Sequence, residues 1–122
     1  MLGAEPRNEQ LILEIYVQNI SASTEFYQRF GFRLLRAEAH FVELGWDQAQ
    51  IYLEEVAYAP EPNSRLAGNV RVLVPDVDRY WTLAQELGCT VIRPIEDRYY
   101  GLRDFTIAGP DGVGLRFASR LS

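Results

Sequence analysis

Hydrophobic and polar positions alternate with a period of two in two separate stretches of the chain, residues 11–17 and 69–74. This alternation is typical of a β-strand with one buried face. Each stretch is followed by apolar residues at helical spacing, and the helical pattern ends at a glycine, Gly31 in the first half and Gly88 in the second. We therefore expect a strand and then a helix in each half. Three further strands are expected after each helix, at residues 33–37, 40–45 and 50–56 and at residues 90–93, 102–108 and 113–119.

The second half of the chain repeats the order of the first. An offset of 57 residues aligns Val17 with Val74, and an offset of 64 aligns Trp46 with Pro110. The change of offset implies an insertion of seven residues within 93–100. An internal repeat of this length indicates a duplicated structural unit. The pattern predicts an α+β fold, with one domain over residues 1–122 made of two βαβββ modules (about 10–58 and 68–120) and a linker at 59–67.

The composition excludes some classes of function but does not identify one. The 122 residues carry a net charge of −5, which argues against a nucleic-acid partner because phosphate contacts need a basic surface. Cys89 is the only cysteine, so no intramolecular disulfide can form. Residues 1–10 contain no apolar stretch typical of a signal peptide, and no apolar run is long enough to span a membrane. We predict a cytoplasmic protein without a membrane partner. The acidic charge suits a cationic ligand, and it suits plain solubility equally well.

Residues 100–107 (Tyr-Gly-Leu-Arg-Asp-Phe-Thr-Ile), followed by the turn at 109–112 (Gly-Pro-Asp-Gly), are the most specific stretch of the chain. Together with two βαβββ modules, this stretch resembles the vicinal-oxygen-chelate superfamily, which includes glyoxalase I, extradiol dioxygenases, fosfomycin-resistance enzymes and bleomycin-binding proteins. The resemblance covers residues 11–119 and is nearest to the bleomycin-resistance group. Gly109 and Val113 depart from the Asp and Asn usual in that group. The resemblance implies curved mixed sheets around a cup, with the helices on the outer face. It also implies a homodimer.

Enzymes of this superfamily hold a divalent metal with ligands on the first and last strand of each module. The positions that match these ligands here are Ile12, Tyr52, Asn69 and Arg116. Ile12 offers no donor atom, and the charge of Arg116 repels a cation. The single histidine, His40, lies on another predicted strand. We therefore expect no metal, no cofactor and no catalytic residues.

One alternative to this prediction concerns the register of the strands. A register shifted by two residues would bring Glu14 and Glu54 toward the ligand positions. Arg71 and Arg116 would then pair with these carboxylates more readily than a metal would.

Strand alternation also predicts which side chains face the cup. The residues expected there by alternation are Glu14, Tyr16, Tyr52, Glu54, Asn69, Arg71 and Arg116. Two more ligand-binding residues are expected outside the strands, Trp46 in a turn and Tyr100 in the inserted loop at 93–100. Carboxylates suit the cationic groups of a ligand, arginines suit its anionic groups, and aromatic rings suit stacking. Trp46 serves as a stacking wall, as a dimer contact or as a side chain buried against the linker. A salt-bridged, water-filled groove without a ligand is the alternative.

These observations lead to three hypotheses about function. The first is a metal-free, non-catalytic protein that resembles bleomycin-resistance proteins and sequesters a polar or cationic small molecule, with antibiotics among the candidates, in the cup or in a dimer groove. The second is an enzyme, either a glyoxalase-type lyase or isomerase or a metal-free variant. In the metal-free variant Glu14 or Glu54 would be the base, and Arg71 or Arg116 would stabilise the enolate. The third is an interaction module without a small ligand.

Overall fold

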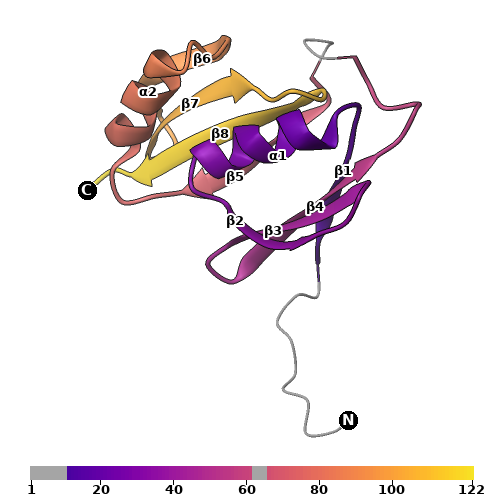
Figure 1. Cartoon of the computed structure of the whole chain (residues 1–122). Helices are drawn as coiled ribbons and strands as arrows, with labels where there is room; N and C mark the ends of the chain where they lie inside the picture. The colour runs from indigo at the N-terminus through magenta and orange to yellow at the C-terminus, as the bar shows by residue number, and fades with distance from the viewer. Residues whose placement is uncertain (1–10, 62–65) are drawn as a thin grey trace, which may run out of the picture. The chain divides into compact units, whose positions relative to one another are not determined.

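The computed structural model describes residues 11–61 and 66–122, and the chain divides into two compact units, Met1–Ala59 and Pro60–Ser122. Each unit contains one helix and one four-stranded mixed sheet in the order βαβββ (Figure 1). The α+β fold of two βαβββ modules predicted from the repeat is therefore confirmed. The prediction that the chain has no signal peptide rests on residues 1–10. Residues 62–65 form part of the predicted linker. Both segments lie outside the described residues.

The two units have the same strand topology. Unit 1 contains β1 (Leu13–Val17), α1 (Ile20–Arg29), β2 (Arg33–Ala37), β3 (Phe41–Trp46) and β4 (Ala49–Glu55). Unit 2 contains β5 (Gly68–Leu73), α2 (Val77–Glu86), β6 (Val91–Asp97), β7 (Leu102–Ala108) and β8 (Val113–Arg120). The sheet orders are β1-β4-β3-β2 and β5-β8-β7-β6. In each sheet the first strand is parallel to the last, and the other pairs are antiparallel.

Each sheet has one face packed against the helix of its own unit. Helix α1 packs against β3 and β4, and α2 packs against β7 and β8. Leu53 of β4 is fully buried in unit 1, and Phe105 and Phe117 are fully buried in unit 2. Because side chains alternate along a strand, the residues between these positions point to the opposite face of the sheet. We call that opposite face the open face.

Local signals in the sequence position both helices. Asn19 caps α1, where its side-chain oxygen accepts a hydrogen bond from the Ala22 amide at 3.0 Å. Asp76 precedes α2 without a side-chain capping bond, and the Val77 amide instead donates to the Ser119 hydroxyl at 2.8 Å. Gly31 follows α1 at a φ of 109°, a conformation that favours glycine.

Strand β6 differs from the prediction. We expected a strand at residues 90–93 and a loop at 93–100, but the strand runs from Val91 to Asp97. Its pairing with β7 shifts register twice, between Val91 and Arg93 and between Arg93 and Glu96. These irregularities obscure the period-two pattern, and Pro94 is tolerated because β6 is an edge strand. The inserted residues therefore lengthen a hairpin and do not form a separate loop.

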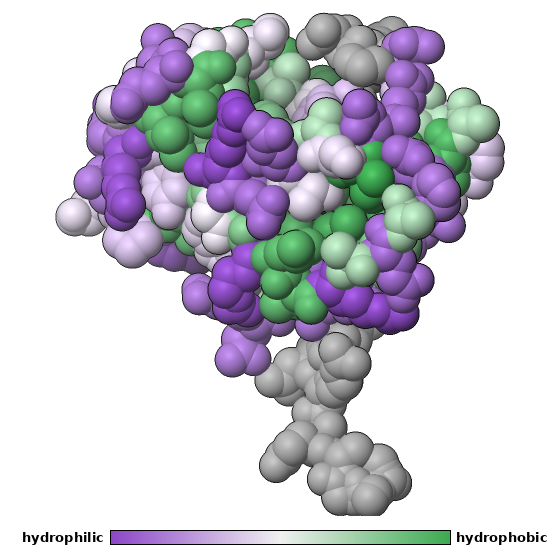
Figure 2. Space-filling model, in the orientation of Figure 1, coloured by the Kyte–Doolittle hydropathy of each residue, from purple (hydrophilic) through white to green (hydrophobic). Residues whose placement is uncertain are grey.

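The surface of the described chain mixes hydrophobic and hydrophilic residues, as Figure 2 shows for one face. Leu34 and Leu35 of the edge strand β2 are both about half exposed. Helices α1 and α2 have ten residues each, so neither of the described helices is long enough to cross a lipid bilayer.

Candidate ligand-binding site

A buried carboxylate organises the open face of the sheet in unit 2. Asp104 of β7 is completely buried, and its Oδ1 accepts a hydrogen bond from Arg98 Nε at 2.8 Å. Its Oδ2 accepts hydrogen bonds from the Tyr100 hydroxyl and from Arg116 Nη2, both at 2.8 Å. Burial alone would raise the pKa of Asp104, but these three hydrogen bonds outweigh burial and lower it. Asp104 is therefore an anion that fixes two arginines and a tyrosine.

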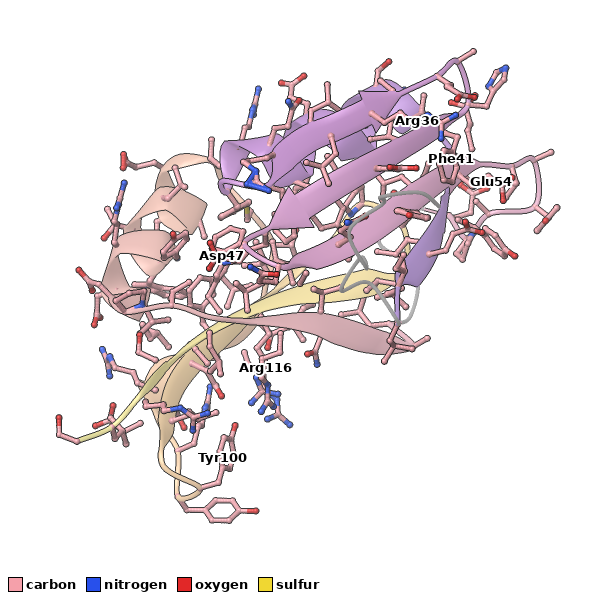
Figure 3. The ribbon with its side chains drawn as sticks, turned by 90° about the horizontal axis from the view of Figure 1, so that it is seen from below. Arg36, Phe41, Asp47, Glu54, Tyr100 and Arg116 are labelled. Carbon is pink, nitrogen blue, oxygen red and sulfur yellow. The ribbon has the colours of Figure 1, made fainter. Side chains whose placement is uncertain are left out.

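Tyr100 and Arg116 are held against one another by this carboxylate. Arg116 Nη2 donates to the Tyr100 hydroxyl as well as to Asp104, and the Arg116 guanidinium lies 5.9 Å from the centre of the Tyr100 ring. Figure 3 shows both side chains on the same side of the sheet. The arrangement fixes the rotamers of the phenol and the guanidinium in advance, which lowers the entropic cost of binding a ligand against them.

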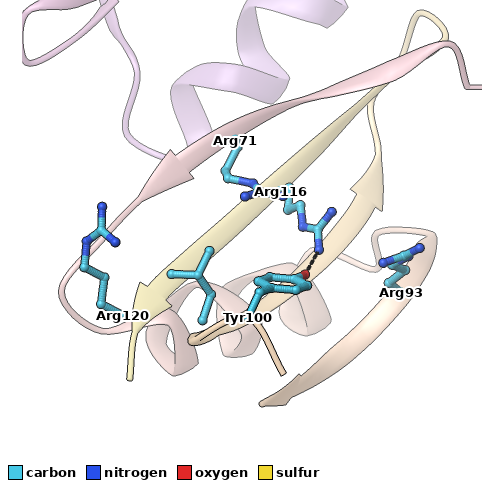
Figure 4. A pocket seen from close by; sticks show the side chains of 6 residues that line it. Arg71, Arg93, Tyr100, Arg116 and Arg120 are labelled. Carbon is cyan, nitrogen blue, oxygen red and sulfur yellow. Dashed lines mark hydrogen bonds between the residues drawn. The ribbon is translucent and has the colours of Figure 1, made fainter. Parts of the chain in front are cut away.

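The same face contains a pocket of about 440 Å³ (Figure 4). Its lining residues come from all four strands of the sheet and from the turn between β6 and β7, and they are Arg71, Arg93, Tyr100, Leu102, Arg116 and Arg120. The register explains why they meet, because Arg71 pairs with Arg116 across the β5–β8 ladder and Leu102 pairs with Arg120 across the β7–β8 ladder. The volume lies within the range usual for small-molecule sites.

The pocket is strongly cationic. Arg116 forms an ion pair with Asp104, whereas the side chains of Arg71, Arg93 and Arg120 form no ion pair or hydrogen bond with the described parts of the chain. Arg116 is only 7% exposed, and its Nε is buried without a hydrogen-bond partner among the described residues. The site therefore offers several unused N–H donors together with uncompensated positive charge.

Thr106, next to this network on β7, has a buried hydroxyl without a hydrogen-bond partner among the described residues. We expect Thr106→Val to raise the free energy of unfolding by about 1 kcal/mol, because the variant keeps the shape of the side chain and removes an unpaired polar group. Chemical denaturation of the purified variant measures this change. Thr82→Val at an exposed position of α2 is the control and should change stability by less than about 0.5 kcal/mol. A less stable Thr106→Val variant would contradict the expectation.

In unit 1 the open face carries two carboxylates and several aromatic rings. Glu14 pairs with Tyr52, and Tyr16 pairs with Glu54, along the β1–β4 ladder. The Tyr16 ring also meets the Tyr58 ring edge to face at 5.5 Å. The neighbouring Tyr58 phenol is the main cause that raises the pKa of Tyr16, followed by burial and by the two carboxylates. This surface has the opposite charge to the pocket of unit 2.

Two other predicted ligand-binding residues lie apart from these side chains. Trp46 of β3 packs on Phe32, with ring centres 5.0 Å apart, and it shares the face of the buried residues Val42 and Leu44. It therefore points away from the open face that carries Tyr52. Asn69 of β5 lies on the open face of unit 2 opposite Gly114, and neither residue lines the pocket.

The residues at the positions matched to metal ligands do not fit a divalent cation. Arg116 places a guanidinium there, bonded to Asp104 and Tyr100, and its charge would repel the ion. Glu14 and Glu54 each point toward the same side of their sheet, but the described residues include no group of three or more His, Cys, Asp or Glu side chains that could hold a metal. His40 hydrogen-bonds with Glu55 at 2.7 Å, and Glu55 in turn accepts the Ile20 amide at the start of α1.

Several important residues of the pocket were not among the predicted ones. Asp104 and Arg98 build the network, and Arg93, Leu102 and Arg120 line the pocket. The antiparallel pairing of β7 with β8 is the signal that could have revealed two of them, because it places Leu102 and Asp104 on the face of Arg116. The ion-pair partner of Arg116 is Asp104, and not the carboxylates of the first module that we considered.

The fold and the open-face pocket define an α+β protein of two βαβββ modules, and comparison with known proteins gives its family. The model of the Glyoxalase/Bleomycin resistance protein/Dioxygenase superfamily matches residues 10–117. The chain belongs to this superfamily, which confirms the resemblance seen in the motif at 100–107. No curated protein sequence matches the chain significantly.

Solved structures of the superfamily share the fold. A glyoxalase/bleomycin resistance protein/dioxygenase from Nocardioides has 20% identity and a TM-score of 0.76, and the match covers 98% of this chain and 88% of that one. The bleomycin resistance determinant encoded on the transposon Tn5 has 16% identity and a TM-score of 0.71, with coverage of 93% and 98%. The fosfomycin resistance protein FosX from Mesorhizobium loti has 15% identity and a TM-score of 0.72, with coverage of 92% for both chains.

Proposed function

We propose that this chain is a binding protein that sequesters a small polar molecule without converting it. The observation that carries the proposal is the pocket of unit 2, in which a buried carboxylate holds Tyr100 and Arg116 in fixed positions. Fixed donors around a pocket of ligand size support recognition. The names of two relatives, a bleomycin resistance determinant and a fosfomycin resistance protein, support antibiotics as candidate ligands. The homodimer implied by the family stays a prediction.

A glyoxalase-type enzyme is the alternative function, and it would require a catalytic base in the site. Proton abstraction next to a carbonyl needs a carboxylate that is free to accept the proton. Asp104 already accepts hydrogen bonds from Arg98, Tyr100 and Arg116, which keep it ionised and occupied. The occupied carboxylate supports binding over catalysis in this pocket. Glu14 and Glu54, the bases considered for an enzyme, lie in unit 1 and do not line it.

A thermal-shift screen of a defined library tests the proposal. The library contains cationic, neutral and anionic metabolites and antibiotics, with bleomycin among the cations, and each compound that raises the melting temperature is recovered and identified by mass spectrometry. We expect at least one compound to raise the melting temperature, because a ligand that binds only the folded state stabilises it. The compound should be recovered unchanged.

Four results would contradict the proposal. Conversion of the compound would favour the enzyme, as would stabilisation by Mn²⁺, Ni²⁺ or Zn²⁺ that a chelator removes. Stabilisation that persists in full in the Tyr100→Ala variant would place the ligand outside this pocket. A library without any stabilising compound would favour an interaction module that needs no ligand.

A further inference from the structure

The pocket in unit 2 is positively charged, although the chain has a net negative charge. Acidic residues outnumber basic ones by 17 to 12, yet four arginines line one pocket. Elsewhere in the described chain Arg29, Arg36 and Arg103 each form an ion pair with a nearby carboxylate. Arg33 and Arg79 form no ion pair with the described residues either, but neither of them lines this pocket with the other arginines. In the pocket the only ion pair is the one between Arg116 and Asp104, as far as the described residues go.

Among the residues that the structure describes, three of these guanidiniums are therefore without a counter-charge around one pocket. Like charges gathered in this way repel one another, and an anion between them removes the repulsion. The planar guanidinium forms paired hydrogen bonds with carboxylate or phosphate oxygens, and it does so more specifically than an ammonium group. A single negative charge would leave most of this positive charge uncompensated.

The volume of the pocket and its uncharged lining residues indicate what the ligand carries besides its negative charges. A volume of about 440 Å³ exceeds what a lone inorganic anion needs. The Tyr100 ring and the Leu102 side chain supply an aromatic and an apolar contact beside the arginines. These surfaces suit an organic body attached to the charged group.

We propose that the pocket of Arg71, Arg93, Arg116 and Arg120 binds a small organic polyanion, with at least two negative charges on phosphate or carboxylate groups. This inference rests on the proposed function and names the class of its ligand. It differs from the cationic ligand that the net charge alone suits. A cationic group would find its complement on the acidic face of unit 1, whereas the pocket of unit 2 would repel it.

Titration with pyrophosphate and with citrate tests the inference, with potassium chloride at matched ionic strength as the reference. The chloride reference removes general salt effects, which screen exposed charges. We expect saturable binding of at least one of the two polyanions by calorimetry, together with a rise in melting temperature. Binding of pyrophosphate alone would assign a phosphate ligand, and binding of citrate alone would assign a polycarboxylate.

Substitutions of the lining arginines test whether the polyanions bind in this pocket. Arg71→Gln and Arg120→Gln each remove one exposed guanidinium and should weaken polyanion binding about tenfold. Arg79→Gln, an exposed arginine on α2 outside the pocket, removes the same charge and should leave the affinity within about twofold. Melting temperatures of the unliganded variants check that each is folded.

The possible failures separate this inference from the proposed function. If neither polyanion binds but a neutral or cationic library compound does, the inference is wrong and the binding function stands. If Arg79→Gln weakens binding as much as Arg71→Gln and Arg120→Gln, the effect is general electrostatics and the inference is wrong. If polyanions and library compounds all fail to bind, both proposals fall.

Discussion

Asp104→Ala should lower the free energy of unfolding by about 3–5 kcal/mol, the loss expected when one partner of a buried ion pair is removed. The carboxylate is completely buried and accepts hydrogen bonds from Arg98, Tyr100 and Arg116. Its removal leaves the guanidinium of Arg116, which is only 7% exposed, without its counter-charge. Urea denaturation followed by circular dichroism measures the change.

Asp97→Ala is the matched control. Asp97 lies in the same hairpin and pairs with Arg103 at 3.1 Å, but its side chain is 63% exposed. Exposed ion pairs contribute little, so this variant should lose less than about 1 kcal/mol. Replacing Arg116 by Met in the Asp104→Ala background should recover part of the stability, because it removes the orphaned charge. Equal losses in Asp104→Ala and Asp97→Ala would show that the network is not a stabilising element.

The pH dependence of stability gives a second readout for Asp104. Its pKa is lowered in the folded protein, so the unfolded state takes up a proton first as the pH falls. The contribution of Asp104 is therefore complete above the ordinary aspartate pKa of about 4 and is lost as the pH falls through the lowered value. As the pH falls below about 4, Asp104→Ala should therefore lose less stability than the unaltered protein does.

The course of each strand was predictable wherever one face of the strand is packed and the other is not. Ile15 and Val17 of β1, and Val72 of β5, lie on the predicted apolar faces and proved to be buried, whereas Leu13 at the start of β1 is about half exposed. Period-two alternation reports burial on one face directly, because successive side chains point to opposite sides. The same rule placed Arg71 and Arg116 on one face before their pairing was known.

The hydrogen-bond network around Asp104 could not be predicted from the alternation of polar and apolar residues. An aspartate on a polar face fits the alternation whether it is solvated or buried, so the pattern carries no signal for its burial. Arg98, which bonds to Asp104, directly follows β6, and β6 continues to Asp97 and shifts register twice against β7. Bulges break the period on which the prediction depends, and their positions follow from pairing that the chain order alone does not reveal.

The net charge of the chain also did not predict the charge of the ligand site. A total of −5 averages over the whole chain, whereas binding depends on which side chains surround one space. The fold gathers Arg71, Arg93 and Arg120 at one pocket, and these residues are distant in the sequence. The local charge of a site is thus a property of strand pairing, and it can have the opposite sign to the whole molecule.

Phe117→Ala should be the most damaging change on the helix-facing side of unit 2, with a loss of about 3–5 kcal/mol in the free energy of unfolding. The Phe117 ring is completely buried, stacks on Tyr80 at 4.5 Å and lies 5.8 Å from the Phe105 ring. Its removal leaves a cavity between α2 and the sheet, which the rigid strands cannot close. Denaturation curves of the purified variant measure the loss.

Two comparisons make this prediction specific. Tyr99→Ala removes an aromatic ring that is 99% exposed in the same unit, so its stability should change by less than about 0.5 kcal/mol. Phe117 and Arg116 are neighbours on β8 and point to opposite faces, so the Phe117→Ala variant should still bind polyanions while it is folded. A folded Phe117→Ala variant that loses polyanion binding would show that the pocket depends on the packing beneath it, and not only on the network of Asp104.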